Sequence, residues 1–126
     1  MLPDDFFSAL LVDHEYKVLT CVTNVEQYLK QQYCDGELKV DDFCKAVHMS
    51  ESTLRRKCLK IFGIPPSELL LRYRIEVAKS LLKEGLAVGD VAGEVGFSTH
   101  AHFSTQFKRF VGITPQNYQK AAKLTE

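Results

Sequence analysis

The sequence lacks any long apolar run, which argues against a membrane-spanning protein. No apolar stretch approaches the ~20 residues that a membrane-spanning helix requires. The N-terminal stretch MLPDDFFSALLV has no Lys or Arg ahead of its short apolar segment, unlike a secretory signal peptide. We therefore expect a cytoplasmic protein.

Closely spaced cysteines and catalytic signatures are also missing. The four cysteines, at positions 21, 34, 44 and 58, form no C-x-x-C pair, so their spacing suggests no metal site. Three of them fall on apolar stripes, where a free Cys packs as a small hydrophobic residue. There are no paired carboxylates, no Gly-rich phosphate loop and no Cys–His constellation with sensible spacing. We expect no metal, no cofactor, no small-molecule substrate and no enzymatic activity.

Net charge is absent as well, because 16 basic residues balance 16 acidic ones. The acidic and basic residues are nevertheless distributed unevenly along the chain. Residues 1–42 hold nine acidic and three basic residues, a net charge of −6, whereas residues 43–126 hold seven acidic and thirteen basic residues, a net charge of +6. A basic C-terminal part that follows an acidic N-terminal part indicates a polyanionic partner. Chance clustering of solvated charges is the alternative.

Helical periodicity runs along the chain, and no period-2 alternation or hairpin turn interrupts it. The acidic leader, residues 1–36, contains an expected helix at 13–33 that Asp13 caps and Gly36 follows. Its apolar stripe consists of Val18, Val22, Val25 and Leu29, with Cys21 and Tyr28 beside it. An apolar tail formed by Leu2, Phe6, Phe7, Leu10 and Leu11 either packs on this helix or docks another domain.

Two stretches of the sequence are nearly alike. FGIPPSELL begins at Phe62 and VGITPQNYQ begins at Val111, so Gly, Ile and Pro recur at an offset of 49 residues. Each stretch ends the same series of a short helix, a tight turn and a second helix. We interpret the repeat as a helix-turn-helix motif that occurs twice.

The first motif is expected at about 40–62. Its inward residues are Phe43, Cys44 and Val47 on the first helix and Leu54, Cys58 and Ile61 on the second. His48 and Met49 form the turn, Ser50 caps the second helix, and Gly63 ends it.

The second motif is expected at about 88–111. Val91, Ala92 and Val95 face inward on its first helix, Gly96 and Phe97 form the turn, and Phe103, Phe107 and Phe110 form the stripe of its second helix. A last short helix runs from Pro115 through Tyr118, and residues 121–126 form a tail.

A long linking helix at about 66–83 joins the motifs, with Leu70, Tyr73 or Arg74, Val77 and Leu81 facing inward. The sequence thus predicts an all-α fold, with two helix-turn-helix subdomains, a long linking helix and an extra N-terminal helix. The linking helix is ~26 Å long at ~1.5 Å per residue. Successive major grooves recur every ~34 Å, so we expect DNA that binds both motifs to bend.

Helical rotation selects the side chains that face away from each core. With Leu54 at zero, Ser52 lies at about 160° and Arg56 at about 200°, which makes Arg56 the best candidate for bidentate contact with guanine. With Phe103 at zero, the equivalent positions are Ala101 and Thr105, which can touch a thymine methyl group. The candidate base contacts are Ser52, Thr53, Arg56, His100, Ala101 and Thr105, and the candidate phosphate contacts are Arg55, Lys60, Lys108 and Arg109. A solvated charged face is the alternative for the basic residues.

This pattern resembles the C-terminal DNA-binding domain of AraC/XylS-type transcription regulators. The most specific stretch is SLLKEGLAVGDVAGEVGFSTHAHFSTQFKRFVGITPQNYQK (80–120), and SESTLRRKCLKIFGIPPSELLLRYR matches the first half of the domain. The resemblance covers about 37–120. It departs from the family at His48, where Gly is common, at Cys58, where an aromatic residue is usual, and at Thr105, where the family often has a DNA-contacting Arg.

The resemblance implies a sequence-specific regulator that binds double-stranded DNA through two recognition helices in successive major grooves. It also implies an activator whose partners include RNA polymerase and a sensor or receiver domain of a longer parent chain. The alternative is a small interaction protein that binds and blocks a full-length regulator of the same family. The acidic N-terminal part and Thr105 favour that alternative, and the dependence of binding on salt separates the two.

Overall fold

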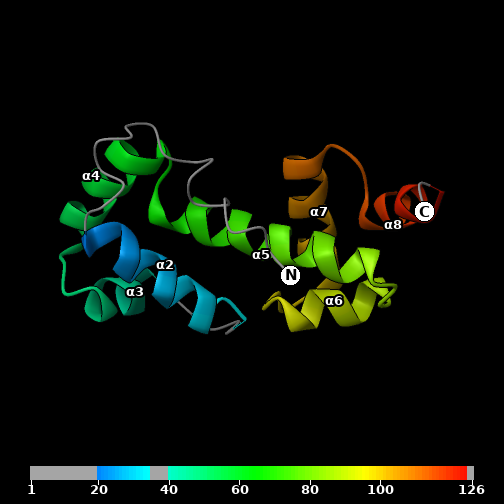
Figure 1. The fold of residues 1–126 in the computed structure, drawn as a ribbon, viewed down its shortest axis with the longest axis horizontal. Helices are drawn as coiled ribbons and strands as arrows, with labels where there is room; N and C mark the ends of the chain where they lie inside the picture. The colour runs from blue at the N-terminus through cyan, green and yellow to red at the C-terminus, as the bar shows by residue number, and fades with distance from the viewer. Residues whose placement is uncertain (1–19, 35–39, 125–126) are drawn as a thin grey trace. The chain divides into compact units, whose positions relative to one another are not determined.

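The computed structural model describes residues 20–34 and 40–124, and these form helices joined by short turns (Figure 1). The helices are α2 (Thr20–Gln32), α3 (Val40–Ala46), α4 (Glu51–Phe62), α5 (Pro66–Lys83), α6 (Val88–Glu94), α7 (His100–Val111) and α8 (Pro115–Leu124). No strand occurs within these ranges, and the predicted all-α fold is confirmed. None of the helices there is both long and apolar enough to cross a bilayer.

Several predicted features lie outside the described residues. They are the Asp13 cap, the apolar tail with Leu2, Phe6, Phe7, Leu10 and Leu11, the turn residue Gly36, and the side chains of Val18, Cys21 and Val22. The described residues fall into two compact units. The N-terminal unit contains α2, α3, α4 and the start of α5 through Leu70, and the C-terminal unit begins at Leu71.

Helix α2 packs within the N-terminal unit. Val25 and Leu29 are completely buried, and the ring of Tyr28 stacks on the ring of Phe43 in α3, with centroids 4.9 Å apart. A stacked aromatic pair adds ~1 kcal/mol to the stabilisation that burial provides. The helix in the acidic leader is therefore part of the core around the first motif. The division of the chain into a leader of 1–36 and a domain of 37–120 stays a prediction.

The two turns have matching hydrogen bonds. The backbone N–H of Val47 donates to Phe43 and that of Met49 to Cys44, just as Val95 donates to Val91 and Phe97 to Ala92. These pairs are related by an offset of 48 residues, whereas the second helices of the motifs are related by 49. Four residues, 47–50, separate α3 from α4, and five, 95–99, separate α6 from α7. The second turn is therefore one residue longer.

The first motif buries a thiol where its two helices meet. Cys44 is buried on α3, and its equivalent on α6 is Ala92, which is also buried. Burial raises the pKa of the Cys44 thiol above its ordinary value of 9.0, and the carboxylates of Glu51 and Asp41 raise this pKa further. Of the described cysteines, Cys44 and Cys58 are buried and Cys34 is exposed, and none of the three is in a disulfide.

Helix α5 buries a wider face than its sequence pattern indicated. Leu69, Ala78 and Leu82 are almost completely buried, whereas Val77 and Leu81 are only partly buried, so the predicted inward positions were displaced by one residue at these two sites. Both Tyr73 and Arg74 are buried. The Arg74 guanidinium lies 5.9 Å from the centre of the Phe97 ring, a cation–π geometry that helps to offset the cost of its burial.

An aromatic cluster forms the core of the C-terminal unit. Phe103 lies 5.3 Å from Phe97 and 5.7 Å from Phe107, and Phe107 lies 5.5 Å from Tyr118, measured between ring centroids. Phe110 is only partly buried, so it forms the margin of the predicted stripe rather than its centre.

Helix α8 continues to Leu124, beyond the predicted end at Tyr118. The side-chain amide of Gln119 donates to the backbone carbonyl of Leu82 at 3.1 Å and to that of Leu86 at 2.7 Å. These two acceptors lie at and just after the end of α5, where helix carbonyls have no partner within the helix. These two hydrogen bonds connect α8, one residue beyond Tyr118, to the end of α5.

Candidate nucleic-acid interface

Helix α4 is defined at both ends by its own sequence. The Ser50 hydroxyl oxygen accepts the backbone N–H of Thr53 at 3.2 Å, which caps the N-terminus. At the other end Gly63 adopts φ 79°, and its N–H donates to the Leu59 carbonyl at 3.1 Å. A left-handed residue at this position is the usual end of a helix, and glycine adopts it without steric cost. The residues between these caps are therefore held in fixed helical register.

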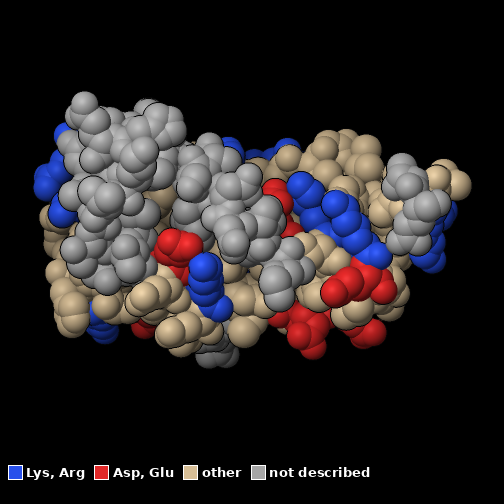
Figure 2. Space-filling model, viewed as in Figure 1, with Lys and Arg blue, Asp and Glu red and all other residues tan. Residues whose placement is uncertain are grey.

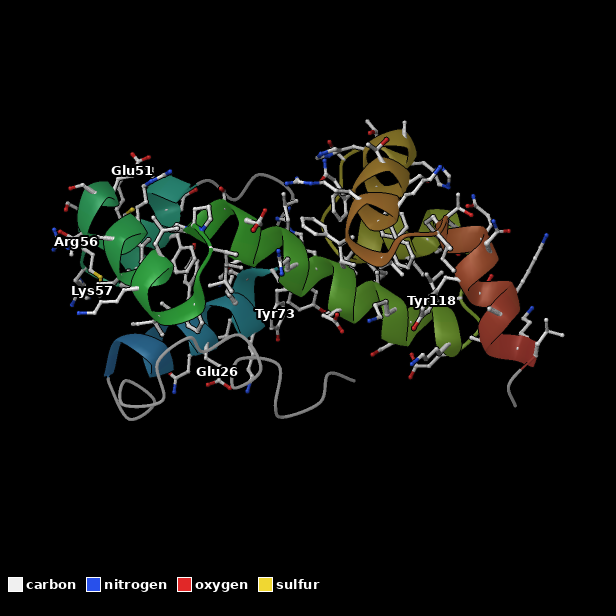
Figure 3. The ribbon with its side chains drawn as sticks, turned by 90° about the horizontal axis from the view of Figure 1, so that it is seen from above. Glu26, Glu51, Arg56, Lys57, Tyr73 and Tyr118 are labelled. Carbon is white, nitrogen blue, oxygen red and sulfur yellow. The ribbon has the colours of Figure 1, made fainter. Side chains whose placement is uncertain are left out.

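The two faces of α4 differ in chemistry as the helical rotation predicted. Leu54, Cys58 and Ile61 are buried. The opposite face carries Ser52 and Arg56, and the other exposed basic side chains, Arg55, Lys57 and Lys60, lie at its flanks. Figure 3 shows Arg56 and Lys57 projecting outward from α4. Within residues 20–34 and 40–124, no carboxylate pairs with Arg55, Arg56 or Lys57. Their charges are therefore available to an external anion.

Thr53 differs from the other candidates on α4. It is partly buried, and its hydroxyl oxygen accepts a hydrogen bond from the Ser50 hydroxyl at 2.8 Å. The Thr53 side chain thus takes part in the cap, which leaves its own hydroxyl hydrogen for an outside acceptor.

Leu59 is a surface residue that the sequence analysis missed. Its exposed fraction is 42%, and it is equivalent to Lys108 in the second motif. With Leu54 at zero it lies at about 140°, next to Ser52 on the outward face. The same rotation that selected Ser52 and Arg56 selects Leu59. It was overlooked because a leucine on an amphipathic helix is expected to face the core.

Helix α7 has the same construction. The Thr99 hydroxyl oxygen accepts the backbone N–H of His102 at 3.1 Å, and Gly112 closes the helix with φ 97°. Phe103 and Phe107 are completely buried. The outward face carries the candidate residues His100, Ala101, Thr105 and Lys108, all of which are exposed. Ala101, Thr105 and Lys108 thus share one face of α7, with His100 at its edge, as Ser52 and Arg56 share one face of α4.

Two side chains on α7 are held by neighbours. The Thr105 hydroxyl donates to the backbone carbonyl of Ala101 at 2.9 Å. Arg109 donates to the Gln106 side chain at 3.4 Å, and its guanidinium lies 4.8 Å from the centre of the Phe110 ring. The Arg72 guanidinium lies 5.4 Å from the same ring. A stacked guanidinium keeps its charge and loses less conformational entropy when it binds a phosphate.

His102 lies apart from His100. The His102 ring contacts Phe97 edge-on, with centroids 5.3 Å apart. In the part of the chain that the structure describes, no group of three His, Cys, Asp or Glu side chains has a geometry suited to a metal ion.

Acidic and basic side chains gather on different elements. Figure 2 shows Lys and Arg side chains at the α4 end of the N-terminal unit and acidic side chains over α6. The exposed acids of α6 are Asp90 and Glu94, and those of α3 are Asp41 and Asp42. In both motifs, therefore, the first helix carries more of the exposed carboxylates, and the second helix carries more of the exposed cations.

The chain matches known proteins over most of this region. A family described as a helix-turn-helix domain matches residues 43–121. The chain is 31% identical over 109 residues to the uncharacterized HTH-type transcriptional regulator YtdP of Bacillus subtilis, and this match covers 86% of the chain and 14% of YtdP. It is 32% identical over 102 residues to the transcriptional regulatory protein HptR of Staphylococcus aureus, with 81% of the chain and 40% of HptR covered. The chain thus spans less than half the length of either relative.

A solved structure is similar to the chain over most of its length. The C-terminal domain of AraT, a response regulator from Geobacillus stearothermophilus, superposes with a TM-score of 0.78 at 27% sequence identity. The match covers 83% of the chain and 88% of that domain.

Proposed function

The chain belongs to the AraC-type helix-turn-helix family of transcription regulators, and we propose that it binds double-stranded DNA sequence-specifically through α4 and α7. The observation that carries this proposal is the outward face of α4. Arg55, Arg56 and Lys57 have no carboxylate partner among the described residues. The ends of the helix are capped, and its opposite side is a fully buried core. A rigid helix with such a face fits the major groove, which is wide enough to admit an α-helix.

The roles of individual residues follow from their chemistry. Arg56 supplies a planar pair of donors suited to the O6 and N7 atoms of guanine. Ser52 lies beside it, and Thr53 has one free hydroxyl hydrogen, so both are proposed as short-range contacts to base edges. Arg55 and Lys60 flank this face and are proposed to bind phosphates, which fixes the register of the helix on the duplex.

The second motif is proposed mainly to position the protein on the duplex. Lys108 and the stacked Arg109 bind phosphates, while His100, Ala101 and Thr105 approach the bases. The motivation is the difference in charge between SESTLRRK in the first motif and STHAHFST in the second. Both motifs are proposed to engage one duplex in successive major grooves, with the first supplying most of the specificity.

The broader biological roles are proposals of the same kind. AraT is a response regulator and HptR is a transcriptional regulatory protein, which supports an output role coupled to a sensor or receiver domain. Activation through contact with RNA polymerase stays a prediction. A cytoplasmic location is proposed because the DNA partner is there.

The direct test is selection of bound duplexes from a random DNA pool, followed by titration of one selected duplex at several salt concentrations. Log K should fall linearly with log [salt], with a slope of about −0.9 for each phosphate neutralised. Binding that is equal for all sequences would contradict the proposal. If no duplex is enriched, but the chain binds and inhibits a full-length regulator of the family, the alternative function of a blocking protein is correct instead.

A further inference from the structure

The outward face of α7 is unusually apolar for a helix that contacts bases. Ala101 and Thr105 are both exposed and lie four residues apart, so their side chains are neighbours on one side of the helix. With Phe103 at zero they lie at about 160° and 200°, opposite the buried core. Ala101 offers only a methyl group.

The hydroxyl of Thr105 is directed to its own helix. Its hydrogen is donated to the Ala101 carbonyl at 2.9 Å, a hydrogen bond between residues four apart. A donor used in this way is not available to an acceptor on a base. What Thr105 offers to a ligand is its methyl group and the remaining lone pair of its oxygen.

Only one base carries a matching apolar group in the major groove. Thymine presents a C5-methyl there, while adenine, guanine and cytosine present only donors and acceptors along that edge. We infer that Ala101 and Thr105 form a methyl-recognition surface, and that the DNA segment read by α7 is specified by the C5-methyl group of thymine. This inference rests on the proposed DNA-binding function, because it names the chemical feature that α7 selects.

Uracil substitution tests the inference directly. In one duplex selected from a random pool, each thymine is replaced in turn by deoxyuridine, which keeps the hydrogen-bonding edge and removes only the methyl group. At one or two positions the affinity should fall by about fourfold, the ratio that corresponds to ~0.8 kcal/mol for one buried methyl group. The other thymines should be insensitive.

Matched variants locate the effect on Thr105. Thr105→Val keeps a methyl group and removes the hydroxyl, so it should retain the preference for the thymine duplex over the uracil duplex. Thr105→Ser keeps the hydroxyl and removes the methyl, so it should bind the thymine duplex about fourfold more weakly and lose its preference over uracil. Thr105 is exposed, so neither change disturbs the core. Replacing the sensitive thymine by 5-methylcytosine should preserve more affinity than replacing it by cytosine.

The possible outcomes distinguish failure of the methyl-recognition inference from failure of the proposed DNA-binding function. If Thr105→Val weakens binding as much as Thr105→Ser does, the hydroxyl makes the contact, and the inference is wrong. It is also wrong if no thymine is sensitive to loss of its methyl group while Arg56→Ala still abolishes preference for the selected duplex. Absence of any selected duplex would instead contradict the proposed function itself.

Discussion

His48 and Gly96 occupy equivalent positions in the two turns, and both have left-handed backbone conformations, with φ of 58° and 92°. Among the described residues His48 is the only non-glycine residue with positive φ. A side chain in this region costs roughly 1–2 kcal/mol, because its Cβ crowds the following carbonyl oxygen. The first turn therefore holds strain that the second avoids.

Replacing His48 by glycine should relieve this strain. His48→Gly is expected to raise the free energy of unfolding by about 0.5–1 kcal/mol, because relief of the left-handed strain exceeds the added entropy of the unfolded chain. Urea denaturation followed by circular dichroism measures the change. Gly112→Ala is the matched control, since a Cβ there meets no atom within 4 Å while φ remains 97°, and it should destabilise by ~1 kcal/mol. A destabilised His48→Gly variant would show that the imidazole makes a favourable contact.

Arg56 is expected to determine specificity, and Lys60 affinity. Arg56→Ala should lose ~1–3 kcal/mol of discrimination at a single base pair of the selected duplex, because the bidentate donor pair is removed. Lys60→Ala should weaken all sequences about equally and reduce the salt slope by ~0.9. Titrations with single-base variants of the duplex distinguish the two effects. Uniform weakening by Arg56→Ala would assign that residue to a phosphate.

Exchanging Leu59 and Lys108 tests whether their equivalent positions face the same ligand. Leu59→Lys adds a cation on the outward face of α4 and should make the salt slope steeper by about 0.9. Lys108→Leu should make it shallower by a similar amount. Both residues are exposed, so thermal stability should change little in either variant. An unchanged slope for Leu59→Lys would show that this edge of α4 does not approach the DNA backbone.

Cys44 should make stability depend on pH above neutrality. Burial holds its pKa above the ordinary value of 9.0, so the folded chain keeps the thiol proton at a pH where the unfolded chain releases it. Its contribution is complete below about pH 9 and is lost as the pH rises from there through the folded pKa. Cys44→Ala, which introduces the residue found at Ala92, should lose less stability between pH 8 and 10.5 than the unmodified chain. Parallel curves of urea midpoint against pH would contradict this.

The features that could be predicted from the sequence are those that depend on neighbouring residues. Ser50 and Gly63 bound α4 because a side-chain cap and a left-handed terminus are local interactions. Pro66 begins α5 because a proline fits the first turn of a helix. The exposed position of Arg56 followed from rotation about the helix axis relative to Leu54.

What could not be predicted depends on contacts between distant segments. Beyond Tyr118, two hydrogen bonds from Gln119 connect α8 to the end of α5, more than thirty residues earlier in the sequence. The buried face of α5 was displaced because the helix has apolar residues on several sides and packs against neighbours along both units. The orientation of the Thr105 hydroxyl depends on a rotamer, which a residue pattern does not specify.

The additional residue in the second turn limits how the two motifs can be recombined. In a chimaera that replaces α7 by α4, alignment at the 48-residue offset of the turns would place Arg55 at the position of Phe103, within the aromatic cluster. Alignment at the 49-residue offset of the second helices places Leu54 at the position of Phe103 and Arg56 at the position of Thr105. Since each residue rotates by ~100° about a helix axis, an engineer who wishes to reprogramme the second half-site while keeping the second turn must align the helices at the 49-residue offset and not at the 48-residue offset of the turns.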